Sequence, residues 1–182
     1  LGQLAPVSAF PIPQEASRSR LVADHARSVM SRRVYTYWTY RSREFLQAVR
    51  ESVAEFKPDR VHLDSLDLSA ALEILPEGVP ISVCHHNVES KLLRRRAESL
   101  GGPKGLYMDL QAELMQAEEA RWMESVTLNY AVSAPDGNDF KRIAPRARLA
   151  VAPNGVDTKG REILTGDKPG LVFVGGASWF PN

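Results

Sequence analysis

The stretch that decides the fold reads PISVCHHNVES and covers residues 80–90. Its first six residues are almost all apolar or small, as expected for a parallel β-strand that is covered on both faces. Polar residues then lead into a helical pattern that starts at Glu89. The same succession recurs on both sides of this stretch. It predicts strands at 60–64, 80–85, 127–133, 148–152 and 170–175, and helices at 15–33, 36–56, 67–75, 89–100, 106–125 and 135–143.

Strands that alternate with helices imply right-handed crossovers and one parallel sheet. The predicted fold class is therefore α/β, with a Rossmann-like parallel sheet flanked by helices. The apolar spacing also predicts which helix faces are buried. The buried stripe of 36–56 should comprise Trp38, Phe45, Val49, Val53 and Phe56, and that of 106–125 should comprise Leu106, Leu110, Leu114 and Ala117.

The composition is that of an ordinary globular protein, since 43% of the 182 residues are hydrophobic and 25% are charged. With 23 Lys+Arg against 22 Asp+Glu, the net charge of +1 gives no general argument for a nucleic-acid partner. The single cysteine, Cys84, excludes an internal disulfide, favours a reducing cytoplasmic setting, and leads us to expect no cysteine-based zinc site. No run of 18 apolar residues is present, so no membrane span is predicted.

Polar and glycine residues gather at the predicted carboxyl ends of the strands, where an open parallel sheet binds ligands. His85 and His86 stand out because imidazoles transfer protons near neutral pH. Neighbouring strand residues point to opposite faces, so at most one histidine faces a given pocket. The alternative is that both only satisfy backbone groups, and His25 and His62 lack the spacing for a zinc site. The strand-end residues are Asp64, His85–Asn87, Ser133, Asn154–Gly155 and Gly175–Gly176.

Two glycine-containing turns leave both a functional and a structural interpretation open. Asn154-Gly155 forms either a turn that lets a ligand approach closely or an ordinary exit from a strand. Gly175-Gly176 could present backbone N–H groups to a phosphate, although the sequence has neither a Walker loop nor a dinucleotide fingerprint there.

Charge is unevenly distributed along the middle of the chain. Lys91 and Arg94–Arg96 follow the histidine pair, whereas the next helix is acidic, with Glu118 and Glu119 among its carboxylates. The favoured interpretation is that these are solvated helix faces that pair with each other. The alternative is a basic surface beside an anionic acceptor or a membrane lipid.

Four strand-end motifs stand in a fixed order: HNVES at 86–90, AVSAPD at 131–136, PNGVD at 153–157, and FVGG at 173–176 followed by WFPN at 179–182. Over residues 58–182 their order and spacing resemble retaining glycosyltransferases of family 4. The resemblance implies the two-domain GT-B fold, in which an acceptor-side domain faces a donor-binding domain. We expect an internal piece of a longer protein, truncated at both ends, with residues 1–153 as the acceptor-side domain, 154–168 as the linker, and 169–182 as the first strand of the donor-binding domain.

The resemblance also implies a reaction and a set of site residues. The whole protein would transfer a sugar from a nucleotide-sugar donor to a glycan, lipid or small acceptor with retained configuration, and this piece alone would be inactive. His86 would lie near the donor sugar and support the reaction by hydrogen bonding and electrostatics, with no metal or other cofactor. Where many relatives carry Arg and Lys after the strand glycine, this sequence has Gly176, Ala177 and Ser178. The implied substrate-binding residues are Asn87, Ser133, Asn154, Gly155, Gly175 and Gly176.

Two other functions stay open at this point. A sugar-nucleotide 2-epimerase shares the two-domain fold, but it needs carboxylates as acid and base, and Glu89 is the one acid in the histidine motif. A non-catalytic α/β module that binds a phosphorylated ligand would need no partner domain. We expect a cytoplasmic protein, with a peripheral contact to the inner membrane surface as the option that the basic helices suggest.

Overall fold

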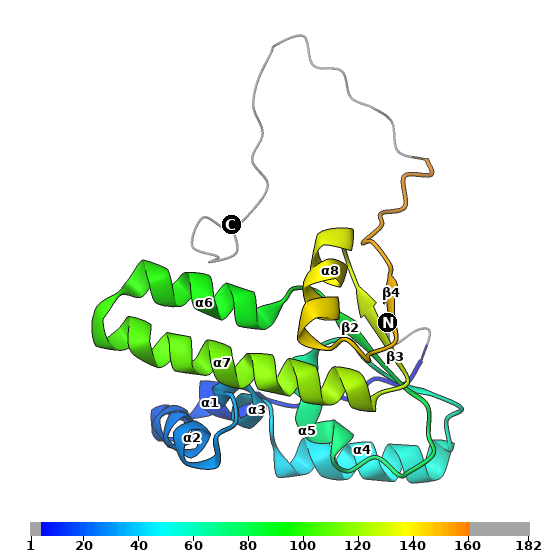
Figure 1. Cartoon of the computed structure of the whole chain (residues 1–182). Coiled ribbons are helices and arrows are strands. Elements are labelled where there is room, and N and C mark those ends of the chain that lie inside the picture. Colours follow the sequence, from blue (N-terminus) through cyan, green and yellow to red (C-terminus); the bar gives the residue numbers. More distant parts are fainter. Residues whose placement is uncertain (1–4, 161–182) are drawn as a thin grey trace.

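The computed structural model describes residues 5–160, which contain a four-stranded, wholly parallel sheet, at the right of Figure 1. Its strands are β1 (Val61–Leu63), β2 (Ile81–His85), β3 (Leu128–Ala131) and β4 (Leu149–Val151), and they lie side by side in chain order. The predicted α/β class and four of the predicted strands are thereby confirmed. The strand expected at 170–175 lies outside the described residues.

Helices cover one face of this sheet. Leu63 and Val83 pack with Trp122 of α7 (Gly102–Ser125), and Ala131 packs with Phe140 of α8 (Ala134–Ile143). Residues two positions apart in a strand share a face, so the opposite face carries Cys84. Cys84 is half-buried and His62, on the same face, is exposed. Ser82 of β2, also on this face, is 3% exposed, so within residues 5–160 the second face is covered in part, at β2 more than at β1.

Helices α6 (Glu89–Leu100) and α7 form an antiparallel hairpin, seen as the two long green helices of Figure 1. Gly101 has a φ of +59°, a left-handed value that glycine adopts without strain. Helix α7 starts four residues before the predicted position because Pro103 fits the first turn of a helix. The two helices approach closely, since a Cβ on Gly105 would lie 2.7 Å from the carbonyl oxygen of Ala97.

The predicted buried face of the long helix is wrong. Leu106 and Leu110 are 74% and 38% exposed, whereas Met108, Ala112 and Met115 are buried. The reason is that this part of α7 is covered from two sides: Met108, Ala112 and Met115 belong to one cluster that includes residues of α6 and of α3 (Tyr35–Thr39) with the residue before it. A helix covered from two sides has no single apolar stripe, so its period does not reveal the buried face.

The acidic side of α7 is also less solvated than expected. Glu118 is 5% exposed and accepts hydrogen bonds from Arg33 Nε (2.6 Å) and Trp122 Nε1 (2.7 Å). Glu119 is 1% exposed and accepts from the backbone N–H of Ser90 (3.1 Å) and from its hydroxyl (2.5 Å). The two carboxylates therefore tie α7 to the N-terminal helices and to the start of α6, rather than lying on a solvated face.

The two N-terminal helices predicted at 15–33 and 36–56 are each divided in two. A serine causes each break, because its hydroxyl caps the next helix. Ser17 accepts from Arg20 N (3.3 Å), and Ser42 accepts from Phe45 N (3.0 Å). The helices are α1 (Pro13–Ala16), α2 (Arg18–Ser31), α3 (Tyr35–Thr39) and α4 (Arg43–Phe56).

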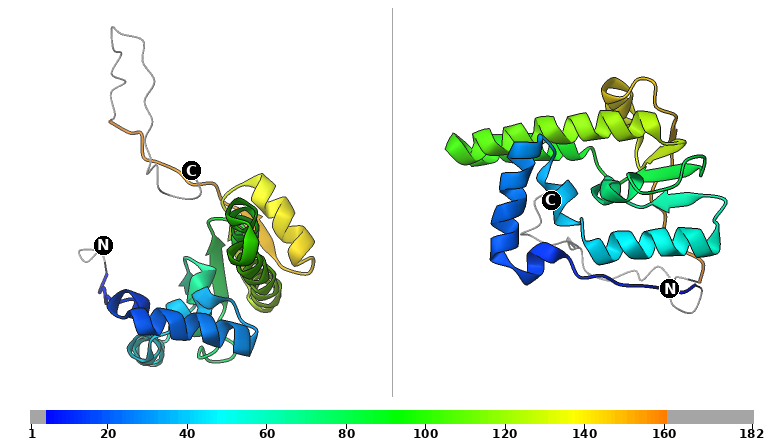
Figure 2. Two further views of the ribbon diagram at one scale, coloured as in Figure 1. Left: turned by 90° about the vertical axis from the view of Figure 1, so that its left-hand side faces the viewer. Right: turned by 90° about the horizontal axis from the view of Figure 1, so that it is seen from below.

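The predicted stripe of 36–56 consequently does not exist as one helix face. Trp38 lies in α3 and Phe45 in α4, although both pack against the same cluster. Phe56 is 81% exposed, and Leu46 is the buried residue of α4. Figure 2 shows the N-terminal helices grouped beside the α6–α7 hairpin.

The connection from β1 to β2 contains less helix than the 67–75 segment predicted from the sequence. It contains a 3₁₀ turn η1 (Leu66–Leu68) and one α-helical turn α5 (Ser69–Leu72). The Ser65 hydroxyl accepts from Asp67 N (3.1 Å), which fixes the chain just after β1. Across residues 5–160, no helix has the length and apolar character needed to cross a bilayer.

Candidate functional site

The strand register brings the polar strand ends to one edge of the sheet. Leu63 of β1 is level with Val83 of β2, and His85 is level with Ala131 of β3. Asp64, which follows β1, is therefore level with Cys84, and His86, two residues after Cys84 on the same face, lies within hydrogen-bonding distance of Asp64. The sheet topology thus assembles a polar edge from residues that are 22 positions apart in sequence.

The two adjacent histidines have different environments. His85 is 4% exposed, its Nε2–H donates to Asn129 Oδ1 (2.9 Å), and its ring lies 4.7 Å from that of Phe140. Burial lowers the pKa of His85, so its neutral form is favoured. His86 points the other way and keeps 45% of its side chain exposed. The expectation that one histidine at most faces a given pocket is confirmed, and His85 is the structural one.

His86 is oriented by a carboxylate. Its Nε2–H donates to Asp64 Oδ1 at 3.2 Å, across the gap between β1 and β2. This hydrogen bond places the proton on Nε2, so Nδ1 keeps a lone pair that can accept from a substrate hydroxyl. An exposed imidazole held in one tautomer is suited to hydrogen bonding with a bound sugar.

A pocket of about 360 Å³ opens beside the same strand end. Asn87 and Glu89 line it from the start of α6, and Asp67 lines it from η1. Aromatic and polar side chains that surround two carboxyl groups are typical of a site that binds hydroxyl-rich small molecules. The other lining residues are Tyr35, Thr36, Tyr40, Leu92, Leu93, Arg96 and Met115.

The pKa values of the two carboxyl groups of this pocket are both raised. Burial raises the pKa of Asp67, and burial followed by repulsion from Asp67 raises the pKa of Glu89. Asn87 Nδ2 donates to Glu89 Oε1 at 3.3 Å. Thr36 Oγ1 is buried in the same wall near Asp67 but forms no hydrogen bond of normal geometry. Carboxyl groups with raised pKa values in a pocket are candidates for acid–base chemistry or for binding hydroxyl groups.

A model of one protein family matches residues 8–159, and its description is Glycosyltransferase Family 4. This match covers more than half of the chain. The chain belongs to glycosyltransferase family 4. Neither the curated proteins nor the solved structures contain a match to it.

The remaining predicted site residues of the family 4 chain are placed as follows. Ser133 caps α8, because its hydroxyl accepts from Asp136 N (3.2 Å) and bonds the Asp136 carboxylate (2.5 Å). Asn154 and Gly155 follow β4 and are exposed. Neither has a positive φ, and a Cβ on Gly155 would meet open space. Gly175 and Gly176 lie outside the described residues.

The sequence thus brings some predicted site residues together and leaves others apart. His86 and Asn87 are adjacent in the chain, but His86 contacts Asp64 while Asn87 contacts the pocket residue Glu89. Within residues 5–160, no hydrogen bond joins Ser133 or Asn154 to His86. Sequence reasoning missed the wall formed by Tyr35, Thr36 and Tyr40, because Thr36 and Tyr40 were expected inside one continuous amphipathic helix at 36–56 and Tyr35 in the connection before it.

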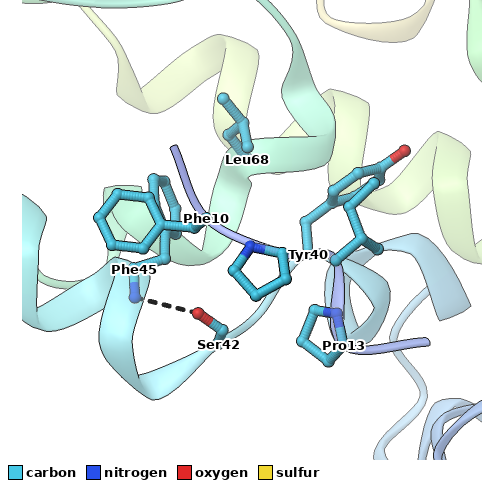
Figure 3. Close-up of a pocket in the computed structure, with 8 residues that line it drawn as sticks. Phe10, Pro13, Tyr40, Ser42, Phe45 and Leu68 are labelled. Atoms are coloured by element: carbon cyan, nitrogen blue, oxygen red, sulfur yellow. Dashed lines mark hydrogen bonds between the residues drawn. The ribbon is translucent and has the colours of Figure 1, made fainter. Parts of the chain in front are cut away.

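A second, smaller pocket of about 200 Å³ lies next to the first and shares Tyr40 with it (Figure 3). Phe10, Pro11 and Pro13 from the N-terminal segment close it over Phe45 and Leu68. Its lining has no charged side chain, and its one serine, Ser42, is occupied in capping α4. This pocket can hold an apolar group, but it offers no group for catalysis.

Proposed function

We propose that this chain is the acceptor-side half of a glycosyltransferase that moves a sugar from a nucleotide donor to an acceptor with retained configuration. Membership of family 4 supports the class of reaction. The observation that carries the assignment of the site is the half-exposed His86, held by Asp64 at the carboxyl end of β2. Donor binding is assigned to a second domain, as the resemblance implies.

In this reaction the bond between the anomeric carbon and the donor phosphate breaks, and a bond to the acceptor oxygen forms. The acceptor proton passes to the departing diphosphate, as the family resemblance implies. His86 needs no proton transfer in this scheme: its ring hydrogen-bonds the donor sugar, and the hydrogen bond from Nε2–H to Asp64 holds the ring in place while positive charge develops at the anomeric carbon. No metal is required by these steps.

The pocket beside β2 is the proposed acceptor site. Its tyrosine rings offer apolar faces to a sugar or small acceptor, and Asn87, Asp67 and Glu89 offer hydrogen bonds to hydroxyl groups. Because Glu89 is half-buried, water cannot fully replace a hydrogen bond between Glu89 and the acceptor once that bond is removed.

We therefore expect Glu89→Leu to raise the KM for the acceptor by about 10-fold or more, since a lost buried hydrogen bond costs about 1–3 kcal/mol. The KM for the nucleotide sugar should stay unchanged. Steady-state kinetics of the full-length enzyme measure both constants. Glu98→Leu, an exposed glutamate of the same helix, is the matched control. Equal effects of the two variants on the acceptor KM would place the acceptor elsewhere.

A 2-epimerase has one structural observation in its favour. Asp67 and Glu89 line one pocket, and each has a raised pKa, which gives the pair of carboxyl groups that such an enzyme needs. Incubation of the full-length protein with a nucleotide sugar labelled in the sugar separates the two reactions. A transferase moves the label into an acceptor with its anomeric configuration kept. An epimerase leaves the label in a sugar inverted at C2.

The third option, a non-catalytic binding module, makes a different prediction for the chain alone. A family 4 transferase divides donor and acceptor between two domains, so residues 1–182 should bind nucleotide sugar only weakly. Isothermal titration calorimetry measures this. Micromolar binding of the donor by this chain, without turnover in the full-length protein, would contradict the proposed division.

A peripheral contact with an anionic membrane is also proposed, but at a different place from the basic stretch in 91–96. A pocket of about 510 Å³ between α2, α3 and α4 is lined by five arginines, and no carboxylate lines it. Asp24, which contacts two of these arginines, is fully buried and held by Arg20 (2.8 Å) and Arg27 (3.0 Å). Arg41 lies against the rings of Tyr37 and Trp38, at 5.5 and 5.4 Å from their centroids, so Arg43 and Arg50 are the arginines proposed to bind phosphate groups.

Binding to vesicles tests this contact. We expect Arg43→Gln combined with Arg50→Gln to weaken binding to phosphatidylglycerol vesicles about 30-fold, because each basic residue near such a surface contributes about 1 kcal/mol. Co-sedimentation measures the change. Lys57→Gln combined with Arg60→Gln, two exposed cations outside the pocket, is the control. Equal loss in both pairs, or equal binding to neutral phosphatidylcholine, would contradict a specific contact.

A further inference from the structure

His86 belongs to a group of three side chains whose atoms are ligands of transition metals. The group consists of Asp64, Cys84 and His86. One carboxylate oxygen, the thiol sulfur and one ring nitrogen all lie within 4.8 Å of one another. This is the chemistry that the sequence alone argued against, because Cys84 is the single cysteine and no histidine spacing pointed to zinc.

The parallel register explains how the group forms. Cys84 and His86 are two residues apart along the chain, so both project from the same face at the end of β2. Asp64 follows Leu63, which is level with Val83, so Asp64 stands beside Cys84 on the neighbouring strand. The ligands thus come from two strands, and a search for spacing along one segment does not find them.

The dimensions of the group suit a tetrahedral ion. Nitrogen and oxygen ligands at about 2.0–2.2 Å from zinc lie about 3.4 Å from each other, and sulfur at about 2.3 Å lies about 3.6 Å from them. His86 Nε2 and Asp64 Oδ1 are already 3.2 Å apart. All three ligand atoms lie within 4.8 Å of one another, so small side-chain rotations bring the remaining pairs to ligand distances. Both His86 and Asp64 are exposed enough to make that rotation, at 45% and 77% of their side chains.

We propose that Asp64, Cys84 and His86 bind a divalent cation of the zinc class, with water as the fourth ligand. Thiolate and imidazole ligands select zinc and its neighbours over magnesium and calcium, which prefer oxygen ligands. Structural zinc sites have four protein ligands, whereas other zinc sites commonly have three protein ligands and a water molecule in the fourth position. The exposed position of His86 and Asp64 gives the ion a path from solvent.

Occupation of this site would inhibit sugar transfer, and this consequence rests on the proposed function. When a metal ion binds Nε2 of His86, the ring proton that Nε2 now donates to Asp64 moves to Nδ1, and the Cys84 thiol proton is released to solvent. The same ion engages the Asp64 carboxylate, so the pair can no longer orient the ring toward a sugar. Zinc is then a reversible inhibitor of the enzyme and takes no part in the catalytic steps.

Cobalt(II) titration of the reduced protein tests the site itself, because cobalt replaces zinc and absorbs light. We expect one equivalent to bind, with a thiolate-to-cobalt charge-transfer band in the near ultraviolet, and zinc to bleach it. Cys84→Ser should abolish the band, and His86→Ala should weaken binding more than about 100-fold, since even partners outside the ligand shell contribute about 10–100-fold. His62→Gln, an exposed histidine on the same face, should bind as the unaltered protein does.

The outcomes separate the site from its consequence. A missing charge-transfer band in the unaltered protein, or a band that survives in Cys84→Ser, overturns the metal site. A His62→Gln loss equal to that of His86→Ala also overturns the ligand assignment. If cobalt binds as expected but zinc leaves the turnover of the full-length enzyme unchanged, the site stands and the proposed role of His86 in sugar transfer fails. Circular dichroism of each variant confirms that it is folded.

Discussion

Replacing His86 with alanine is expected to lower kcat of the full-length glycosyltransferase by about 10²–10³-fold, the usual loss when one preorganised electrostatic group is removed. The ring is half-exposed and its partner Asp64 is exposed, so its removal leaves no buried polar group without a partner. Thermal stability should therefore change little. Turnover with nucleotide sugar and acceptor, measured beside a thermal melt, gives both values.

The neighbouring histidine is the matched control for this result. His85→Ala removes a 4% exposed ring and leaves Asn129 Oδ1 without its donor. We expect it to lower the free energy of unfolding by about 2–4 kcal/mol, from the cavity and the unsatisfied acceptor together. Two adjacent histidines would then separate cleanly, one affecting turnover and the other stability. Unchanged kcat in His86→Ala would contradict the assignment of the site.

Glu119→Gln is expected to stabilise the protein above neutral pH by roughly 3 kcal/mol. Burial raises the pKa of Glu119 to about 7, against an ordinary value of 4.5, and outweighs its hydrogen bonds from Ser90. Below pH 4.5 the group is protonated in both the folded and the unfolded state. Between pH 4.5 and 7 the carboxyl ionises in the unfolded state but stays protonated in the folded state. The folded state therefore loses stability as the pH rises through this range to 7. Each pH unit of difference corresponds to about 1.4 kcal/mol.

Glutamine keeps an oxygen that can accept from the Ser90 N–H, and it cannot ionise. Urea unfolding at pH 4 and at pH 8 measures the effect. The free energies of the unaltered protein and Glu119→Gln should be similar at pH 4 and should diverge at pH 8. Glu113→Gln, an exposed carboxylate of the same helix, is expected to show no such divergence. The assignment would be contradicted if Glu119→Gln lost as much unfolding free energy between pH 4 and pH 8 as the unaltered protein does.

The strands could be predicted from the sequence because their apolar runs are short, bounded by turns and separated by helices. Residues 80–85, predicted from composition alone, contain β2 (Ile81–His85). The ends of helices were harder to predict, because a capping side chain can start a new helix where the apolar period continues. Ser42 caps the start of α4 and so interrupts the predicted stripe between Trp38 and Phe45. The buried face of α7 could not be predicted, since it depends on two partners that the helix meets only in the folded chain.

The candidate site shows the same division between what is local and what depends on packing. The sequence placed Asp64, His86 and Asn87 at one sheet edge, because carboxyl ends of parallel strands coincide. It did not predict the 3.2 Å contact between His86 and Asp64, which needs the strand register. It assigned Glu118 and Glu119 to a solvated face, and their burial follows from Arg33 and Ser90, which approach from other elements.

The claim that the carboxyl ends of β1 and β2 form one wall of a sugar-transfer site is tested most directly by a crystal structure of the full-length enzyme with an intact nucleotide-sugar analogue. We expect the His86 ring within hydrogen-bonding distance of the donor sugar, at about 3 Å, with the pocket of Tyr35, Asp67 and Glu89 open toward the anomeric carbon. A donor sugar seated at the opposite edge of the sheet, with protein between it and His86, would contradict the claim.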